Sequence, residues 1–158
     1  MLDDIQKKYI KKESNYGAEN YKPLPVVLSK AKGVWAWDVN NNKYLDMMSG
    51  YSAVSHGHAH PELLKVFHEQ SAKLSLTSRA FHTDQLGPYL ETLSKISGFE
   101  MALPMNSGAE AVETAIKSAR RWAYRVKKIK PNTAEIIVAA GNFHGRTTTI
   151  ISLSLIHI

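Results

Sequence analysis

The stretch Met101-Ala-Leu-Pro-Met-Asn-Ser-Gly-Ala-Glu110 indicates the fold class, because a short apolar segment there passes directly into a predicted helix. A second apolar segment, residues 135–140, follows that helix. Strand, helix and strand form a βαβ unit, so the sequence predicts an α/β fold with two parallel strands joined by a right-handed crossover. The helix is predicted from apolar residues that recur every three or four positions, namely Val112, Ala115, Ile116, Ala119, Trp122, Ala123 and Val126.

The start of this helix is the first candidate binding site. Ser107 is suited to cap the helix, and Glu110, three residues later, completes a capping box. Gly108 lets a backbone approach closely, and the first turn of a helix presents unpaired N–H groups at the positive end of the helix dipole. These features suit a phosphate group, although a well-capped helix without a ligand shows the same pattern.

The loop Gly141-Asn-Phe-His-Gly-Arg-Thr147 is the second candidate, since ligands of parallel α/β folds bind beyond the carboxyl ends of strands. Phe143 is suited to stack on a planar ring, and Arg146 to grip a carboxylate with two hydrogen bonds. The alternative is a glycine-bounded turn with a core Phe and a surface Arg.

The rest of the chain carries weaker candidates. His56, His58 and His60 alternate and would face one side of a strand as metal ligands. Gly57 and Pro61 favour a loop instead, and no carboxylate alternates with these histidines nearby, so no metal site is predicted.

The other expected elements are a polar helix and loop over residues 1–20, an extended segment over 21–28, a hairpin of strands 33–37 and 43–47, a helix starting at Pro61, and a helix over 84–97 ended by Gly98.

Composition excludes several classes of protein. The 158 residues include no cysteine, which excludes disulfide scaffolds and thiol nucleophiles, and no run approaches the roughly 18 apolar residues of a membrane span. The first nine residues are charged and contain no secretory signal, so a cytoplasmic protein without membrane association is expected. The net charge of +6 comes from lysines and arginines that lie on helix faces or beside acids, so nucleic acid is not the expected partner.

The motifs together resemble the class III aminotransferases, pyridoxal-phosphate enzymes of fold type I. The resemblance covers about residues 15–152, and the chain is most similar to the ornithine-specific branch of that family. It is carried by Asn20-Tyr-Lys-Pro-Leu-Pro-Val26, Gly50-Tyr-Ser-Ala-Val54, Gly57-His-Ala-His-Pro61, Leu76-Thr-Ser-Arg-Ala-Phe81, Leu103-Pro-Met-Asn-Ser-Gly-Ala-Glu-Ala111 and the 141–147 loop.

The resemblance implies a role for each candidate residue toward the cofactor, pyridoxal 5'-phosphate, and the substrates. Ser107, Gly108 and Ala109 would hold the cofactor phosphate, Phe143 would stack on the pyridine ring, and His144 would lie beside it. Tyr21 and Tyr51, which by themselves predict half-buried structural tyrosines, would line the substrate pocket, with Tyr21 recognising the amino-acid end of ornithine; Arg146 would bind a substrate carboxylate.

The implied reaction transfers the δ-amino group of L-ornithine to 2-oxoglutarate, giving glutamate and glutamate semialdehyde, which cyclises to pyrroline-5-carboxylate. The resemblance also implies a homodimer. Residues 1–55 would belong to the small domain, and 56–152 would begin the large parallel or mixed-sheet domain. Residues 153–158 do not match the family and are expected to be a non-native tail.

The resemblance also implies that four parts of the active site lie beyond this chain: the Schiff-base lysine, the aspartate on the pyridine nitrogen, a partner-subunit threonine and a second arginine. No catalytic residue is therefore assigned here, and the chain alone is expected to be inactive. The alternatives are an acetylornithine or 4-aminobutyrate aminotransferase, a phosphate-binding module without catalysis, and a basic nucleic-acid-binding protein.

Overall fold

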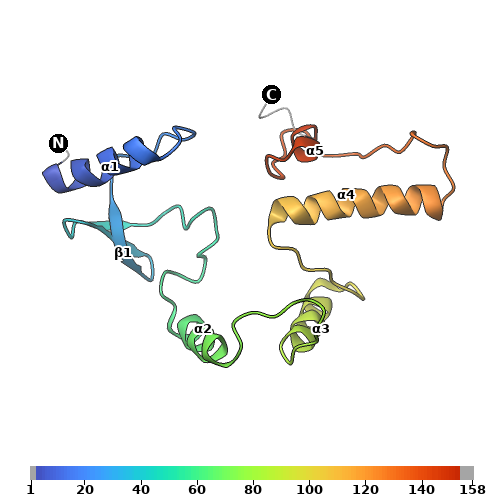
Figure 1. The fold of residues 1–158 in the computed structure, drawn as a ribbon, viewed down its shortest axis with the longest axis horizontal. Coiled ribbons are helices and arrows are strands. Elements are labelled where there is room, and N and C mark those ends of the chain that lie inside the picture. Colours follow the sequence, from blue (N-terminus) through green and yellow to red (C-terminus); the bar gives the residue numbers. More distant parts are fainter. Residues whose placement is uncertain (1–2, 154–158) are drawn as a thin grey trace. The chain divides into compact units, whose positions relative to one another are not determined.

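The computed structural model describes residues 3–153, and the chain divides into two units, Met1–Phe81 and His82–Ile158 (Figure 1). Of the predicted tail at residues 153–158, all but Leu153 lies outside the described residues. The helices of the described part include none long and apolar enough to cross a membrane. The predicted domain boundary between residues 55 and 56 stays a prediction.

The first unit is built around a small antiparallel sheet with strand order β1-β2-β3. Both the amino-terminal helix and the helix that begins at Pro61 are confirmed. The elements are α1 (Asp4–Tyr16), β1 (Leu28–Lys32), β2 (Trp35–Asp38), β3 (Lys43–Leu45) and α2 (Pro61–Lys73).

The predicted hairpin is β2 and β3, in which Trp35 pairs with Leu45 and Trp37 with Lys43. Strand β1 was not predicted: its sequence is mixed and polar, and it becomes a strand by pairing antiparallel with β2. A bulge interrupts this pairing near its start. The hairpin therefore supplies the partner that the β1 sequence needs.

Asp38 ties the hairpin to α1 and is fully buried. Its carboxylate accepts hydrogen bonds from the backbone of Asn40, from the backbone and side chain of Asn42, from Tyr44 and from Gln6 of α1, at 2.8–3.1 Å. Burial by itself would raise the pKa of Asp38, but the bonds from Asn42, Tyr44 and Asn40 together lower it. The turn is thus organised around a carboxylate that stays ionised.

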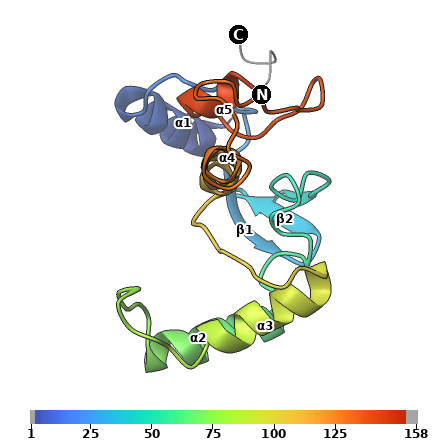
Figure 2. The ribbon, with the colours of Figure 1, turned by 90° about the vertical axis from the view of Figure 1, so that its right-hand side faces the viewer.

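The second unit contains α3 (Leu86–Ser97), α4 (Gly108–Arg125) and the short α5 (Thr148–Ile151). The prediction for α3 is confirmed: Gly98 ends it in the left-handed conformation, with φ of 73°. Helix α5 lies beside the amino-terminal part of α4 (Figures 1 and 2), and its Ile150 is only 1% exposed. This packing holds the end of the 141–147 loop against α4.

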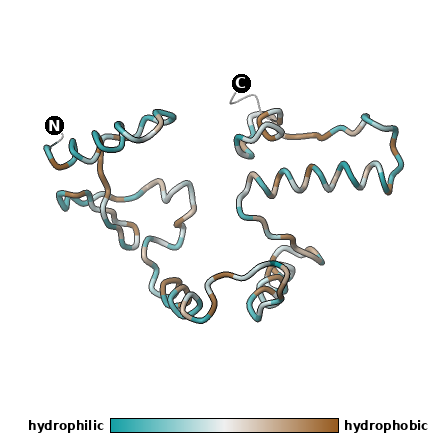
Figure 3. Tube along the Cα trace, viewed as in Figure 1, coloured by the Kyte–Doolittle hydropathy of each residue, from teal (hydrophilic) through white to brown (hydrophobic). Residues whose placement is uncertain are grey.

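The prediction of two parallel strands flanking α4 is wrong for the described residues. Residues 101–105 and 135–140 both form irregular chain. A strand needs a neighbour to complete its hydrogen-bond ladder, and these two segments do not pair with each other. The second segment remains apolar and open to solvent, with Ile137 98% exposed; it is the apolar run leading from α4 toward α5 in Figure 3.

Candidate functional site

The amino-terminal end of α4 forms a cradle of backbone donors. Ser107 is its N-cap, and its hydroxyl accepts a hydrogen bond from the Glu110 N–H at 3.2 Å. The Glu110 carboxylate in turn accepts from the Asn106 N–H at 2.9 Å, so the predicted capping box forms one residue earlier than expected on that side. Helix geometry leaves the N–H groups of Gly108 and Ala109 without an acceptor inside the helix. This end of α4 therefore offers N–H donors and a positive dipole end to an anion.

The 141–147 loop packs directly on this cradle. Gly145 has a φ of +122°, and a Cβ placed on it would lie 2.9 Å from the Ala109 Cβ and 3.6 Å from the Ile150 Cδ1. The Thr147 hydroxyl donates to the Glu113 carboxylate of α4 at 2.6 Å. Only glycine fits this close approach, so the loop touches the cradle through Gly145.

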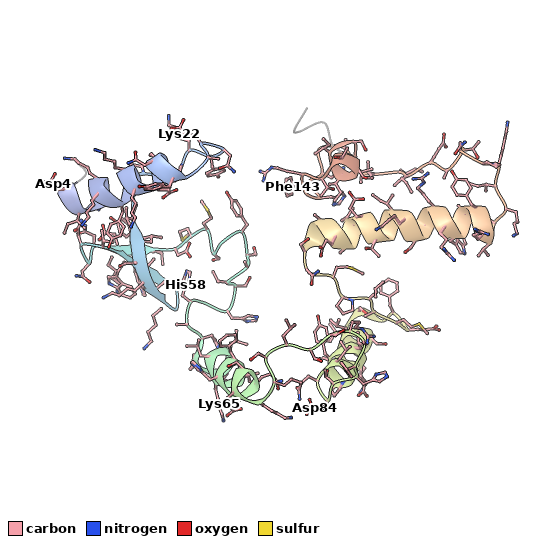
Figure 4. All side chains as sticks on the ribbon, viewed as in Figure 1. Asp4, Lys22, His58, Lys65, Asp84 and Phe143 are labelled. Carbon is pink, nitrogen blue, oxygen red and sulfur yellow. The ribbon has the colours of Figure 1, made fainter. Side chains whose placement is uncertain are left out.

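The side chains predicted to bind the ring and the carboxylate extend from this loop. Phe143, labelled in Figure 4, is 56% exposed, and the Arg146 guanidinium lies over its ring at 5.4 Å from the centroid. His144 is exposed between Phe143 and Gly145. The contact between loop and cradle thus joins the two candidate sites of the sequence: Ser107, Gly108 and Ala109 with Phe143, His144 and Arg146. The two candidate sites meet because the 141–147 loop packs on α4, whereas the sequence suggested that they meet at the ends of two parallel strands.

Tyr21 and Tyr51 meet in the first unit, where their hydroxyl oxygens are 3.4 Å apart. Both rings are largely exposed, at 69% and 79%, so neither is the half-buried structural tyrosine that the residue type alone suggests. Thirty residues separate them in the sequence. Two phenol groups side by side provide donors and acceptors for a polar substrate.

The three alternating histidines do not converge. The His58 Nε2 lies 2.7 Å from a carboxylate oxygen of Asp46, and the rings of His56 and His60 contact each other edge-on, with centroids 6.3 Å apart. Within residues 3–153, no three His, Cys, Asp or Glu side chains are grouped so that they would hold a metal ion.

Sequence reasoning missed Asp46. The His58 contact lowers the pKa of Asp46, as do the backbone N–H groups of Ser49 and Met48. An Asp directly after a strand is a weak signal for a turn that it caps. His58 lies twelve positions later, beyond a loop, so no helix or strand spacing links the two residues. Only the fold reveals this pair.

Residues 16–156 match the family described as aminotransferase class-III. An ornithine aminotransferase of Halalkalibacterium halodurans is 60% identical over 145 residues, which make up 92% of this chain and 36% of that protein. The chain therefore spans about a third of the length of the curated relatives it matches.

Two solved structures show the same likeness. The ornithine aminotransferase of Toxoplasma gondii, crystallised with partial occupancy of PLP at its active site, superposes with a TM-score of 0.91 at 42% identity, covering 94% of this chain and 35% of that one. The acetylornithine aminotransferase of Elizabethkingia anophelis gives 0.83 at 54% identity, covering 90% and 36%. The predicted fold class, the α/β architecture of fold type I, is confirmed.

Proposed function

Because the chain belongs to the class III aminotransferase family, we propose that its complete gene product transfers the δ-amino group of L-ornithine to 2-oxoglutarate with pyridoxal phosphate as cofactor. The products are glutamate and glutamate semialdehyde, which cyclises to pyrroline-5-carboxylate. The observation that supports the proposal is the contact of Gly145 with Ala109, because it brings the loop that carries Phe143 and Arg146 against the start of α4.

The residues present fit the cofactor. A Cβ added to Gly108 would meet nothing within 4 Å, so the start of α4 is open to a phosphate group. The Gly108 and Ala109 N–H groups and the Ser107 hydroxyl are the donors that would hold it. Phe143 would cover one face of the pyridine ring, with His144 beside it.

Pyridoxal phosphate, when bound, supplies the electron sink for breaking the C–H bond at the carbon that bears the amino group. The side chains of this chain bind and orient. Arg146 holds a substrate carboxylate with its two-pronged fork, and Tyr21 and Tyr51 orient the amino donor, Tyr21 at its amino-acid end.

The proposal assigns the remaining parts to protein outside these residues: the lysine that anchors the cofactor, the aspartate for the pyridine nitrogen, a second arginine and a threonine from the partner subunit. It thereby makes this chain the amino-terminal part of a homodimeric cytoplasmic enzyme with small-molecule substrates. Residues 1–55 then belong to the small domain, and residues 56–152 begin the large one.

A second candidate is transamination of N-acetyl-L-ornithine, which is favoured by the 54% identity to the Elizabethkingia anophelis enzyme. Kinetics of the complete gene product on L-ornithine, N-acetyl-L-ornithine and 4-aminobutyrate, each with 2-oxoglutarate, separate these activities. We expect L-ornithine to give the highest kcat/KM, and Tyr21→Phe to lower kcat/KM for L-ornithine more than for the acetylated donor. A preference for N-acetyl-L-ornithine would contradict the proposed donor while leaving the reaction class intact.

A further inference from the structure

The loop of residues 46–58 is closed at its base by two independent contacts. Asp46 continues the hairpin, since its N–H donates to the Val34 carbonyl at 2.9 Å, and His58 exchanges two backbone hydrogen bonds of 2.8 Å with Gly33. The side chains of Asp46 and His58 then join at 2.7 Å. Both side chains are partly buried, with exposures of 20% and 28%, so this contact is only partly open to water. Figure 4 labels His58 at this position.

The second carboxylate oxygen of Asp46 holds the start of an unusual turn. It accepts from the backbone N–H groups of Met48 and Ser49, at 3.0 and 2.9 Å. Directly after it, four consecutive residues, 49–52, have φ values of 50°, 55°, 55° and 73°. Three of these four are not glycine, and such residues rarely adopt this conformation, so the turn needs bonds from outside to keep it. Asp46 supplies them from its position directly after β3.

Tyr51 lies within this turn. Its N–H donates to the Met48 carbonyl at 3.0 Å, and its hydroxyl lies 3.4 Å from that of Tyr21. The direction of the Tyr51 ring is set by the backbone of the turn, and the turn is set by Asp46. We propose that Asp46 and His58 are positioning residues: together they fix Tyr51 beside Tyr21, and so set the affinity of the enzyme for its amino donor.

The chemistry of the pair defines which replacements preserve it. An ionised carboxylate only accepts, so its partner at the His58 Nε2 is an N–H, present in the imidazolium and in the Nε2–H tautomer of the neutral ring. Glutamine at this position carries an N–H donor at a similar reach, whereas phenylalanine has the ring shape without a donor. Asparagine at position 46 has only one acceptor oxygen. With that oxygen toward the Met48 and Ser49 N–H groups, its NH₂ group faces His58; with the oxygen toward His58, the turn loses its acceptor.

The inference rests on the proposed function and is tested on the complete, cofactor-loaded protein. In Asp46→Asn and His58→Phe we expect KM for L-ornithine to rise tenfold or more, with kcat and cofactor affinity within twofold of the wild type. His58→Gln should return KM to within threefold. His56→Phe is the matched control on the same loop and should leave KM unchanged. Because Asp46 acts through Tyr51, adding Asp46→Asn to Tyr51→Phe should raise KM no further; additive effects would overturn the inference.

Hydrogen exchange supplies a readout that does not depend on activity. Amides of residues 48–57 should exchange at least tenfold faster in Asp46→Asn and His58→Phe but not in His58→Gln, while amides of the β1–β2 pair stay protected. Unchanged exchange, or equal loosening of loop and sheet, would overturn the inference. If Asp46→Asn does not fold, the exchange rates and KM of His58→Phe still test the inference. A wild-type protein that does not use L-ornithine would defeat only the proposed function, because the exchange pattern still tests the positioning of Tyr51.

Discussion

Replacing Gly145 by alanine tests whether the 141–147 loop and the start of α4 form one cofactor site. At a φ of +122° an alanine is strained, and its Cβ would lie 2.9 Å from the Ala109 Cβ, well inside normal carbon contact distance. Backbone strain of this kind costs about 1–3 kcal/mol, and overpacking about as much again. The combined cost of about 2–6 kcal/mol corresponds to a roughly 30-fold to 20,000-fold loss of affinity, if the loop must be held in place for binding.

An exposed loop relaxes part of that strain by moving away from α4, which lowers the cost but also withdraws Phe143 from the cradle. We therefore expect Gly145→Ala to weaken pyridoxal phosphate binding by the complete protein at least tenfold. The measurement is a titration of cofactor-free protein, followed by cofactor absorbance and by quenching of protein fluorescence.

Matched variants separate the causes. Gly98→Ala meets the same left-handed strain, at φ +73°, with nothing within 4 Å and far along the chain from the loop, so it should lower stability without changing cofactor affinity. Ala109→Gly removes the atom that the new Cβ would strike, so the double variant Gly145→Ala with Ala109→Gly should recover the steric part of the loss. Wild-type affinity in Gly145→Ala, or no recovery in the double variant, would refute the contact as the link between loop and cradle.

Arg146→Lys should raise KM for 2-oxoglutarate roughly tenfold in steady-state kinetics and leave cofactor affinity unchanged, because lysine keeps the charge but loses the two-pronged bond; an unchanged KM would argue against a carboxylate role. Asp38 has a lowered pKa, so its contribution to stability is full above the ordinary Asp pKa and is lost as pH falls through the lower folded-state value. Below about pH 4, the free energy of unfolding measured in urea should therefore fall less steeply with pH in Asp38→Asn than in the wild type. Parallel curves for the two proteins would contradict this. The 158-residue chain alone should self-associate in size-exclusion chromatography with light scattering, since Ile137 is 98% exposed and the buried apolar residues of the described part are Ala36, Ile116 and Ile150; a soluble monomer with a sharp cooperative melt would show the opposite.

The sequence predicted what local chemistry determines. The cap at Ser107 forms because its hydroxyl needs only an N–H three residues away, and the end of α3 at Gly98 needs only a residue that tolerates positive φ. The hairpin follows equally from its short asparagine-rich turn, where Asp38 and Asn42 bond within four residues. In each case the signal and the partner lie within one turn of the chain.

Prediction failed where the partner is remote. Residues 135–140 have the apolar composition of a buried strand, but composition cannot supply the neighbour that a ladder requires, and the segment stays irregular. The reverse holds for β1, whose polar sequence gives little sign of a strand and which pairs because β2 lies alongside. Strand formation is in both cases a property of the pair of segments.

The same distinction explains how the candidate site was found and what was missed in it. Phe143 and Arg146 were identifiable because the glycines that aim them lie within the same seven residues. Tyr51 was identifiable only through family resemblance, because its placement depends on Asp46 before it and His58 after it, which meet by folding back of the chain. A residue that binds a ligand directly can be recognised from a sequence motif, whereas a residue that positions another residue is recognised only from their contact in the fold. In the proposed enzyme we therefore expect the preference for an amino donor to depend on contacts such as Asp46 with His58, which sequence motifs do not contain.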